Sequence, residues 1–391
     1  MPKGIEIISI LAIGPAMAFV FSFLCLKLKL PVIIGQLLAG YLIGPFSPGY
    51  VADYKTTEQL ADIGVILMLF GVGLHFKIAE LIKVKKIAIP GAIIQIILIF
   101  SITFGILPLF GVPLLSSGVI GLSVAVASTV VVLKILLDYG LLDTKSGTIT
   151  VGELIVEDVF TIFVLLMLPL FGSLFQENAV LDYGIIKNII FSLAKCALFV
   201  LLMLTVVQIV ISKVLTHVAQ FKSQEMLTLA IVAIIFSATI GPAYLLGLPI
   251  SLGAFLTGIL IGNTSVRDEA TADSLPLKNI FSVLFFLSIG MLFNPKVLVT
   301  HLSLFLILLF IIVIIKPLTT FGVSKLLGCN TKNALVIGLA SGQIGEFSFI
   351  LAEDATKMNI LPDYFYDIIV ACAIVSLLLN SLLFKRLKSV P

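Results

Sequence analysis

The sequence predicts an all-α polytopic membrane protein with 13 transmembrane helices, arranged as two inverted six-helix repeats plus a linker helix. Three observations carry this prediction. The 391 residues are 60% hydrophobic and only 12% charged, whereas an ordinary soluble domain is about 25% charged. The apolar residues fall in long runs, many near the roughly 20 residues that a bilayer-spanning helix needs. The third observation is an internal similarity between the two halves of the chain.

Thirteen apolar runs follow one another along the chain, separated by short connections. The first run, 5–26, is too long for the core of a signal peptide and no small-residue cleavage site follows it, so we expect a spanning helix. No connection is long enough to hold a soluble domain, so residues 1–391 are expected to form a single transmembrane domain. The predicted helices are 5–26, 31–46, 59–76, 87–110, 115–137, 148–173, 186–214, 224–243, 248–263, 276–293, 298–326, 331–353 and 364–384.

Basic residues are distributed unequally between the two sides of these predicted helices. Of the 24 Lys and Arg residues, 17 lie in connections on the side opposite the N-terminus and 5 lie on the N-terminal side. Cytoplasmic connections are enriched in Lys and Arg. We therefore expect a multi-pass protein of the cell inner membrane with its N-terminus outside and its C-terminus in the cytoplasm.

The internal similarity recurs at a nearly constant spacing. Residues 30–44 (LPVIIGQLLAGYLIG) and 248–262 (LPISLGAFLTGILIG) are identical at eight of fifteen positions, at an offset of 218. At offset 217, Gly73 corresponds to Gly290. The spacing equals seven helices, an odd number, so the second copy is expected to enter the membrane upside down, as in secondary transporters whose site lies near the midplane. Repeat one is predicted at about 5–173, the linker helix at about 186–214 and repeat two at about 224–384.

Acidic residues inside the run 148–173 mark a candidate site. A charge at the centre of a spanning helix costs about 2.5 kcal/mol or more, yet this run carries Glu153, Glu157 and Asp158. Glu153 and Glu157 are four residues apart and share a helix face. We predict that Glu157 and Asp158 bind the ion and the proton. Two interpretations of Glu153 stay open: a hydrated residue near the cytoplasmic entrance, or a proton relay.

Small and polar residues interrupt two helices at corresponding positions of the repeats. The run 115–137 contains VAST, and the run 331–353 contains SGQIGE. Irregular backbone within a membrane is tolerated only where it lines a cavity or is buried in protein. Both helices are therefore predicted to be broken and to direct half-helix dipoles and free carbonyls at one site. The residues expected there are Ser128, Thr129, Gln343 and Glu346.

Lys316 precedes Pro317 inside the apolar run 298–326. A buried ammonium needs a partner, and in one interpretation Glu157 or Asp158 forms an ion pair with it. In the other, Lys316 bonds backbone carbonyls freed by the proline kink.

Taken together, these residues resemble the monovalent cation:proton antiporter-2 family, most closely the Kef-type potassium:proton antiporters. The resemblance covers essentially the whole chain. It implies the sodium/proton antiporter fold, with a six-helix transport domain, a scaffold domain that forms a homodimer, and crossed broken helices. The motifs that carry it are residues 30–45, 61–70, 127–129, 157–158, 285–290, 316–317 and 342–347.

The resemblance also assigns roles to single residues. It implies that Asp158 binds the ion and the proton, and that Glu157 pairs with Lys316. Glu157 is a departure, because the family has Asp, Asn or Gln at this position. Kef-type proteins continue into a cytoplasmic nucleotide-binding domain, but no G-x-G-x-x-G fingerprint occurs here between a strand and a helix. We therefore expect no soluble nucleotide-binding domain and no cofactor in this chain.

The expected function is secondary active transport, exchanging a monovalent cation for protons by alternating access. Oxygen ligands suit potassium and sodium alike, and the resemblance favours potassium. A gated monovalent cation channel and an ion-coupled organic-anion symporter on a similar fold remain alternatives. No Ser-His-Asp set, metal cluster or phosphate loop is visible, so we expect no enzyme, and no nucleic-acid partner. The expected partners are K⁺ or Na⁺, protons, membrane lipid and a second copy of the chain.

Overall fold

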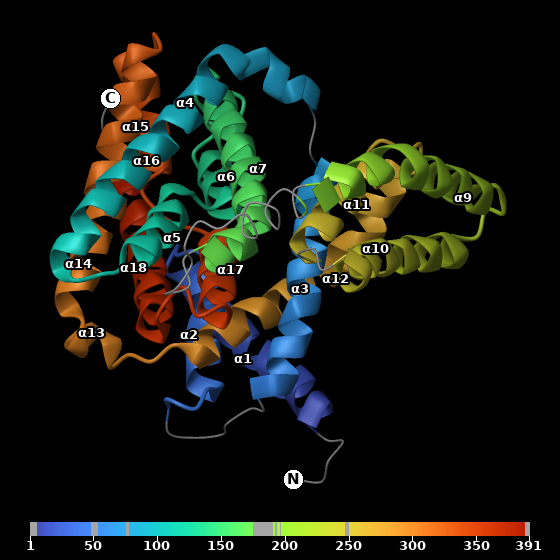
Figure 1. Ribbon diagram of the computed structural model, residues 1–391, viewed down its shortest axis with the longest axis horizontal. Coiled ribbons are helices and arrows are strands. Elements are labelled where there is room, and N and C mark those ends of the chain that lie inside the picture. The colour runs from blue at the N-terminus through green and yellow to red at the C-terminus, as the bar shows by residue number, and fades with distance from the viewer. Residues whose placement is uncertain are drawn as a thin grey trace. The chain divides into compact units, whose positions relative to one another are not determined.

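The computed structural model describes residues 6–47, 54–75, 78–174, 191, 194–195, 197–246 and 250–387. These residues form helices and short connections, with no strand among them (Figure 1). Within this described part, seven helices are long and apolar enough to cross a membrane, and shorter apolar helices accompany them. The predicted all-helical membrane architecture is confirmed.

The helices follow the predicted order along the chain. They are α1 (Glu6–Lys27), α2 (Val32–Ile43), α3 (Tyr54–His75), α4 (Ile78–Ile106), α5 (Leu114–Ala125), α6 (Thr129–Asp138), α7 (Lys145–Leu174), α9 (Gln208–Gln220), α10 (Gln224–Leu246), α11 (Ile250–Gly262), α12 (Arg267–Leu292), α13 (Val297–Thr300), α14 (Leu302–Phe310), α15 (Lys316–Leu326), α16 (Thr331–Ala340), α17 (Glu346–Lys357) and α18 (Asp363–Leu387). A 3₁₀ turn (Leu107–Phe110) follows α4, and π-helical turns precede α9 (Met203–Val207) and α15 (Ile311–Ile315). The predicted linker helix, 186–214, lies partly outside the described residues.

Two helices extend well beyond their predicted starts. α4 begins at Ile78 rather than at 87, and α12 begins at Arg267 rather than at 276. The added turns carry charged residues, among them Lys86 and Glu269. Hydropathy marks only the apolar part of a helix, whereas Lys and Glu are good helix formers that continue the helix past the apolar run.

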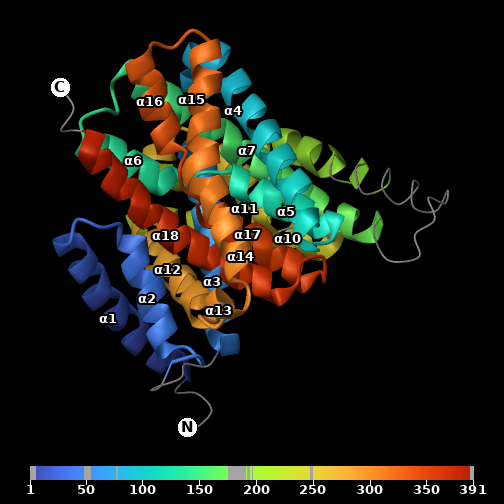
Figure 2. The same ribbon diagram turned by 90° about the vertical axis from the view of Figure 1, so that its left-hand side faces the viewer.

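Contacts between Cα atoms divide the chain into two compact units. The first contains Met1–Ala18, Val51–Phe76 and Leu165–Ser288, and the second contains Phe19–Tyr50, Lys77–Val164 and Ile289–Pro391. In the first unit, α11 packs against α3 and α10. In the second unit, α15 packs against α16 and α4, and α5 packs against α4 and α17 (Figure 2).

Glycines in the two repeats make matching close contacts. In the first unit, Gly73 of α3 lies so close to the backbone of Phe255 in α11 that a Cβ atom has no room. In the second unit, Gly290 of α12 lies in the same way against the backbone of Leu37 in α2. Gly73 and Gly290 are mates at offset 217, and Leu37 and Phe255 are mates at offset 218. The similarity found in the sequence thus reappears as equivalent small-residue helix packing.

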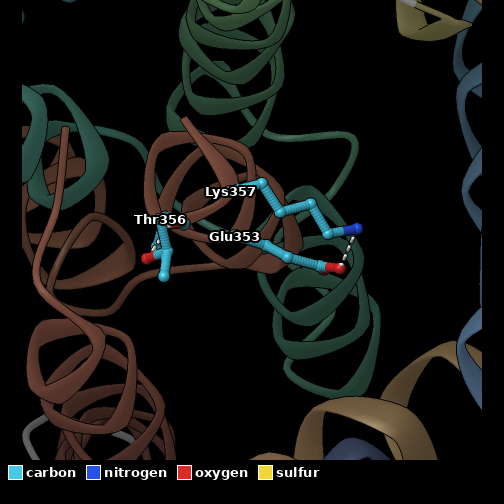
Figure 3. A network of polar contacts seen from close by, with 4 residues as sticks. Glu353, Thr356 and Lys357 are labelled. Atoms are coloured by element: carbon cyan, nitrogen blue, oxygen red, sulfur yellow. Dashed lines mark hydrogen bonds and ion pairs between the residues drawn. The ribbon is translucent and has the colours of Figure 1, made fainter. Parts of the chain in front are cut away.

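The half-helix α17 is buried at its start and polar at its end. Residues 346–352 are buried. In the last turn, Lys357 Nζ forms an ion pair with Glu353 Oε1 at 2.8 Å, and Thr356 Oγ1 donates to Ala352 O at 2.8 Å (Figure 3). The Lys357 side chain is 48% exposed, so this pair contributes about 0.3–0.5 kcal/mol. The buried end of α17 is the end that reaches the candidate site.

Candidate functional site

The backbone between α5 and α6 leaves helical geometry. Val126 (φ −94°, ψ 139°) and Ser128 (φ −77°, ψ 114°) are both extended. Ser128 caps the second half-helix, because its Oγ accepts the N–H of Val131 at 3.3 Å, the usual role of a serine at a helix N-terminus. The predicted break in this helix is confirmed.

The second predicted break, between α16 and α17, is also confirmed. α16 ends at Ala340, and Gly345 is extended directly before α17. A Cβ atom on Gly345 would collide with Ser128, so the two breaks touch each other. The Gln343 amide fastens this crossing: its Oε1 accepts the Ser128 N–H at 3.2 Å, and its Nε2 donates to Ser128 O at 3.3 Å.

α7 places two carboxylates at the first break. Glu157 Oε2 accepts the N–H of Ala127 at 2.8 Å. Asp158 accepts from Thr129 Oγ1, at 2.9 Å through Oδ2 and 3.1 Å through Oδ1. Both acidic side chains are 3% exposed. They lie at the N-terminus of α6, where the partial positive charge of the helix dipole stabilises negative charge.

A third carboxylate comes from the second broken helix. Glu346, the first residue of α17, accepts from Ser128 Oγ at 2.9 Å and is 4% exposed. Asp158 interacts electrostatically with both Glu346 and Glu157. The three acidic groups therefore form one buried cluster around the crossing of the two breaks.

Lys316 supplies the positive charge of this cluster. Its side chain is fully buried, and its Nζ donates to the carbonyl oxygen of Gln343 at 3.1 Å. The ammonium also interacts electrostatically with Glu157. Its hydrogen bond thus goes to a freed carbonyl of the broken helix, while its charge faces a carboxylate. A π-helical turn (Ile311–Ile315) stands directly before Lys316, where the missing N–H of Pro317 disturbs the helical hydrogen bonds.

The net charge of the cluster defines what it can bind. Fully ionised, three carboxylates and one ammonium leave an excess of negative charge in a buried site. Such a site is costly unless cations or protons neutralise it. The arrangement is therefore chemically suited to take up a small cation or a proton, and its oxygen donors suit a hard cation.

Residues 15–388 match the transmembrane family of sodium/hydrogen exchangers. The chain belongs to this family. This exchanger-family chain is 37% identical over 388 residues to a protein of Escherichia coli (strain K12) that is named "Putative cation/proton antiporter YbaL". The match covers 99% of the chain and 70% of YbaL. It is 31% identical over 366 residues to K(+) efflux antiporter 4 of Arabidopsis thaliana, and there it covers 92% of the chain but only 60% of the relative.

A solved structure supports the same fold. The sodium proton antiporter MjNhaP1 from Methanocaldococcus jannaschii superposes with a TM-score of 0.72 at 17% sequence identity, over 96% of each chain. At this identity the likeness shows the fold. Both of these sequence relatives carry antiporter names, in agreement with the exchanger family to which the chain belongs.

Polar residues outside the predicted set stabilise the breaks. Gln95 of α4 donates through Nε2 to Ala125 O, the last carbonyl of α5, at 3.0 Å. Asn380 of α18 donates through Nδ2 to Leu339 O, near the end of α16, at 2.7 Å. The first bond satisfies a carbonyl at a helix end, and the second adds to the N–H of Gly342, which Leu339 O also accepts at 3.1 Å. In the sequence, each of these two residues can be recognised as a single amide side chain within a long apolar helix.

Glu153 occupies a separate position one turn before Glu157. Its side chain is 6% exposed, and its Oε1 has no hydrogen-bond partner. It lies against Gly91 of α4 and interacts electrostatically with Glu157. The structure therefore buries Glu153 within the protein, and both interpretations of it, a hydrated residue near an entrance and a proton relay, stay predictions.

A cavity of about 760 Å³ lies beside the site within the second unit. This α6 cavity is lined by the end of α1 (Leu26), the turn that follows it (28–31), the start of α2 (32–33), α6 and α18. Its wall includes Val131, whose N–H bonds to the capping Ser128. The cavity therefore reaches the first turn of α6.

Proposed function

We propose that this protein exchanges a monovalent cation for protons by alternating access. The observation that carries the proposal is the buried cluster of Glu157, Asp158, Glu346 and Lys316 at the crossing of two broken helices. Membership of the sodium/hydrogen exchanger family supports it. A cluster with excess negative charge holds either cations or protons, and competition between them is the basis of exchange.

Asp158 is the proposed group for which cation and proton compete. Its carboxylate accepts two contacts from one hydroxyl, that of Thr129. When a dehydrated cation binds, the oxygens of Thr129 and Ser128 complete its shell together with the Asp158 carboxylate. When a proton binds instead, the cation loses its main ligand. The six-helix transport domain then moves against the scaffold domain only when the site is neutralised, because an uncompensated charge crosses the bilayer at high cost.

Lys316 and Glu153 take supporting roles in this proposal. Lys316 holds the carbonyl of Gln343 and balances Glu157, so it keeps the crossing in place while Asp158 exchanges its ligand. Glu153 is one turn from Glu157 with an unpartnered oxygen. It is placed to pass a proton along α7, so we propose it as the proton relay.

Potassium is the proposed cation. The relative from Arabidopsis thaliana is named a K(+) efflux antiporter, and oxygen donors alone suit both potassium and sodium. The α1–α2 turn and the C-terminal end of α18 are on the side of the membrane that carries most of the basic residues. We therefore propose that both face the cytoplasm of an inner membrane. The α6 cavity then lies on the cytoplasmic side, and the working unit is a homodimer.

The test is transport into proteoliposomes that contain a pH-sensitive dye. We expect a potassium pulse to move protons through the wild-type protein, a sodium pulse to move fewer, and Asp158→Asn to move none. The substitution removes the charge but keeps an oxygen that accepts from Thr129, so the fold is retained. Asp143→Asn is the matched control, because Asp143 is exposed in the turn between α6 and α7.

Each contrary result has a defined meaning. Proton movement by Asp158→Asn at the wild-type rate rejects the assignment of Asp158. Cation flux without proton movement identifies a gated channel. Proton movement driven by an organic anion, with no response to potassium or sodium, identifies a symporter.

A further inference from the structure

The α6 cavity carries a charge opposite to that expected along a cation route. Its described lining residues include two cationic side chains, Lys29 and Lys385, and no carboxylate. Both lysines are exposed. Tyr139 and Ser381 are also among the lining residues, and the other lining residues are apolar. The cavity thus combines two ammonium groups with an apolar wall.

The backbone of Lys29 has an unfavourable conformation for lysine. Its φ is 59°, in the left-handed region. The Lys29 N–H donates to Leu26 O at 3.0 Å and the Leu30 N–H donates to Cys25 O at 2.8 Å, a helix ending that ordinarily has glycine at this position. The same pair of bonds with a positive φ occurs at Gly111, Gly140, Gly328 and Asn359. Lys29 thus adopts a backbone conformation that glycine adopts at lower cost.

Exposed apolar side chains lie beside the two lysines. Leu26, Leu28 and Leu382 line the cavity and are 50–70% exposed. Figure 2 shows the turn between α1 and α2 near the C-terminal end of α18, the two elements that contribute these residues. A free anion would satisfy the lysines but would leave the leucines uncovered, whereas a phospholipid with an anionic head group would satisfy both.

We propose that the α6 cavity binds an anionic phospholipid. The phosphate lies between Lys29 and Lys385, and the acyl chains cover Leu26, Leu28 and Leu382. Basic pockets between transmembrane helices bind anionic head groups on the cytoplasmic side of membranes. Because phosphate and ammonium are both partly hydrated at the mouth, the affinity is expected to fall as salt rises.

The test measures lipid binding by the full chain, without transport. Purified protein in a neutral detergent is titrated with phosphatidylglycerol, and bound lipid is counted by native mass spectrometry while the melting temperature is followed. We expect saturable binding of phosphatidylglycerol with a rise in the melting temperature, and neither effect from phosphatidylcholine. Inorganic phosphate at the same concentrations is expected to have no effect.

Two variants and a matched control decide the location. Lys29→Gly is expected to weaken binding at least fivefold, as is Lys385→Gln, and the double variant is expected to lose saturable binding. Glycine is the favoured residue at φ 59°, so Lys29→Gly keeps or raises the melting temperature in the absence of lipid. Lys222→Gly is the control, because Lys222 has the same left-handed backbone (φ 55°) at the end of α9 and is not among the lining residues.

Three results would overturn the proposal. One is wild-type affinity in the Lys29→Gly/Lys385→Gln double variant. Another is an equal loss of affinity in Lys222→Gly. The third is a response to inorganic phosphate that matches the response to phosphatidylglycerol, which would assign the lysines to a soluble anion.

Discussion

At the scale of single residues, the buried charges of the site depend on one another. Lys316 is fully buried and donates to a backbone carbonyl, and its charge is balanced by Glu157. Removal of one of two interacting buried charges leaves the other less compensated, which lowers the stability of the fold. Removal of both leaves no such charge. The two side chains should therefore behave as a coupled pair in stability measurements.

We predict that Lys316→Gln lowers the melting temperature by several degrees. The double variant Lys316→Gln/Glu157→Gln is expected to lose less stability than the two single variants lose together. A coupling of about 0.5–3 kcal/mol is expected for residues that belong to one polar network. Thermal unfolding of the detergent-purified protein measures it. Lys325→Gln is the control, because Lys325 is an exposed residue of the same helix, α15. Strictly additive losses would show that the two charges do not interact.

At the scale of helices, close packing at glycine is repeated in the two halves of the chain. Gly73 in α3 and Gly290 in α12 each face the backbone of a neighbouring helix with no space for a Cβ atom. Gly322 in α15 has nothing within 4 Å of the same position. At the first two positions, glycine therefore allows two helix backbones to come close together. At the third position, glycine only lowers the helix propensity.

We predict that Gly73→Ala and Gly290→Ala each lower the melting temperature, and by similar amounts, because they occupy equivalent contacts. Gly322→Ala is expected to leave it unchanged or raise it, since alanine is favoured over glycine in a helix by about 1 kcal/mol. Thermal unfolding of the three variants under one condition is the measurement. A stable Gly73→Ala together with a destabilised Gly290→Ala would contradict the equivalence of the two repeats.

The half-helices show how an element is stabilised by groups outside it. The last carbonyl of α5 accepts from Gln95 of α4, and Leu339 O near the end of α16 accepts from Asn380 of α18 as well as from the Gly342 N–H. Each bond contributes about 0.5–1.5 kcal/mol, but leaving a buried carbonyl without a partner costs more, about 1–3 kcal/mol. The breaks are therefore fixed structures whose irregular backbone is largely satisfied, a requirement for a site that binds a dehydrated ion.

At the scale of the whole molecule, the distribution of basic residues sets the proposed orientation. The turn between α9 and α10 contains Lys222, and the connection after α12 contains Lys296. These two lysines lie on opposite sides of the membrane in the proposed topology. Both side chains are exposed, so they report on the side of the membrane that they face.

We predict that Lys296→Cys reacts with a membrane-impermeant maleimide added outside intact cells, and that Lys222→Cys reacts only after permeabilisation. Both variants are made after replacement of the four native cysteines. Labelling followed by mass analysis is the measurement. Labelling of position 222 in intact cells would reverse the topology, and with it the assignment of the α6 cavity to the cytoplasmic side.

The sequence by itself determined the membrane class, the order of the spans and the positions of both breaks, and it predicts the inverted repeat. These features depend on composition and on short-range spacing, because a bilayer demands apolar runs and interrupts them only at a cost. The acidic residues Glu157 and Asp158 stood out for the same reason. Hydropathy did not locate the starts of α4 and α12, since helices continue past the apolar region.

Only the tertiary structure decided which polar groups meet. The Gln343 amide bonds Ser128, which is 215 residues away in the sequence, and Lys316 bonds the backbone of Gln343. The burial of Glu153 against Gly91 and the meeting of Lys29 with Lys385 in one cavity arise in the same way. The pattern along a helix shows which residues share a face, but the neighbour of that face is set by packing between helices far apart in the chain.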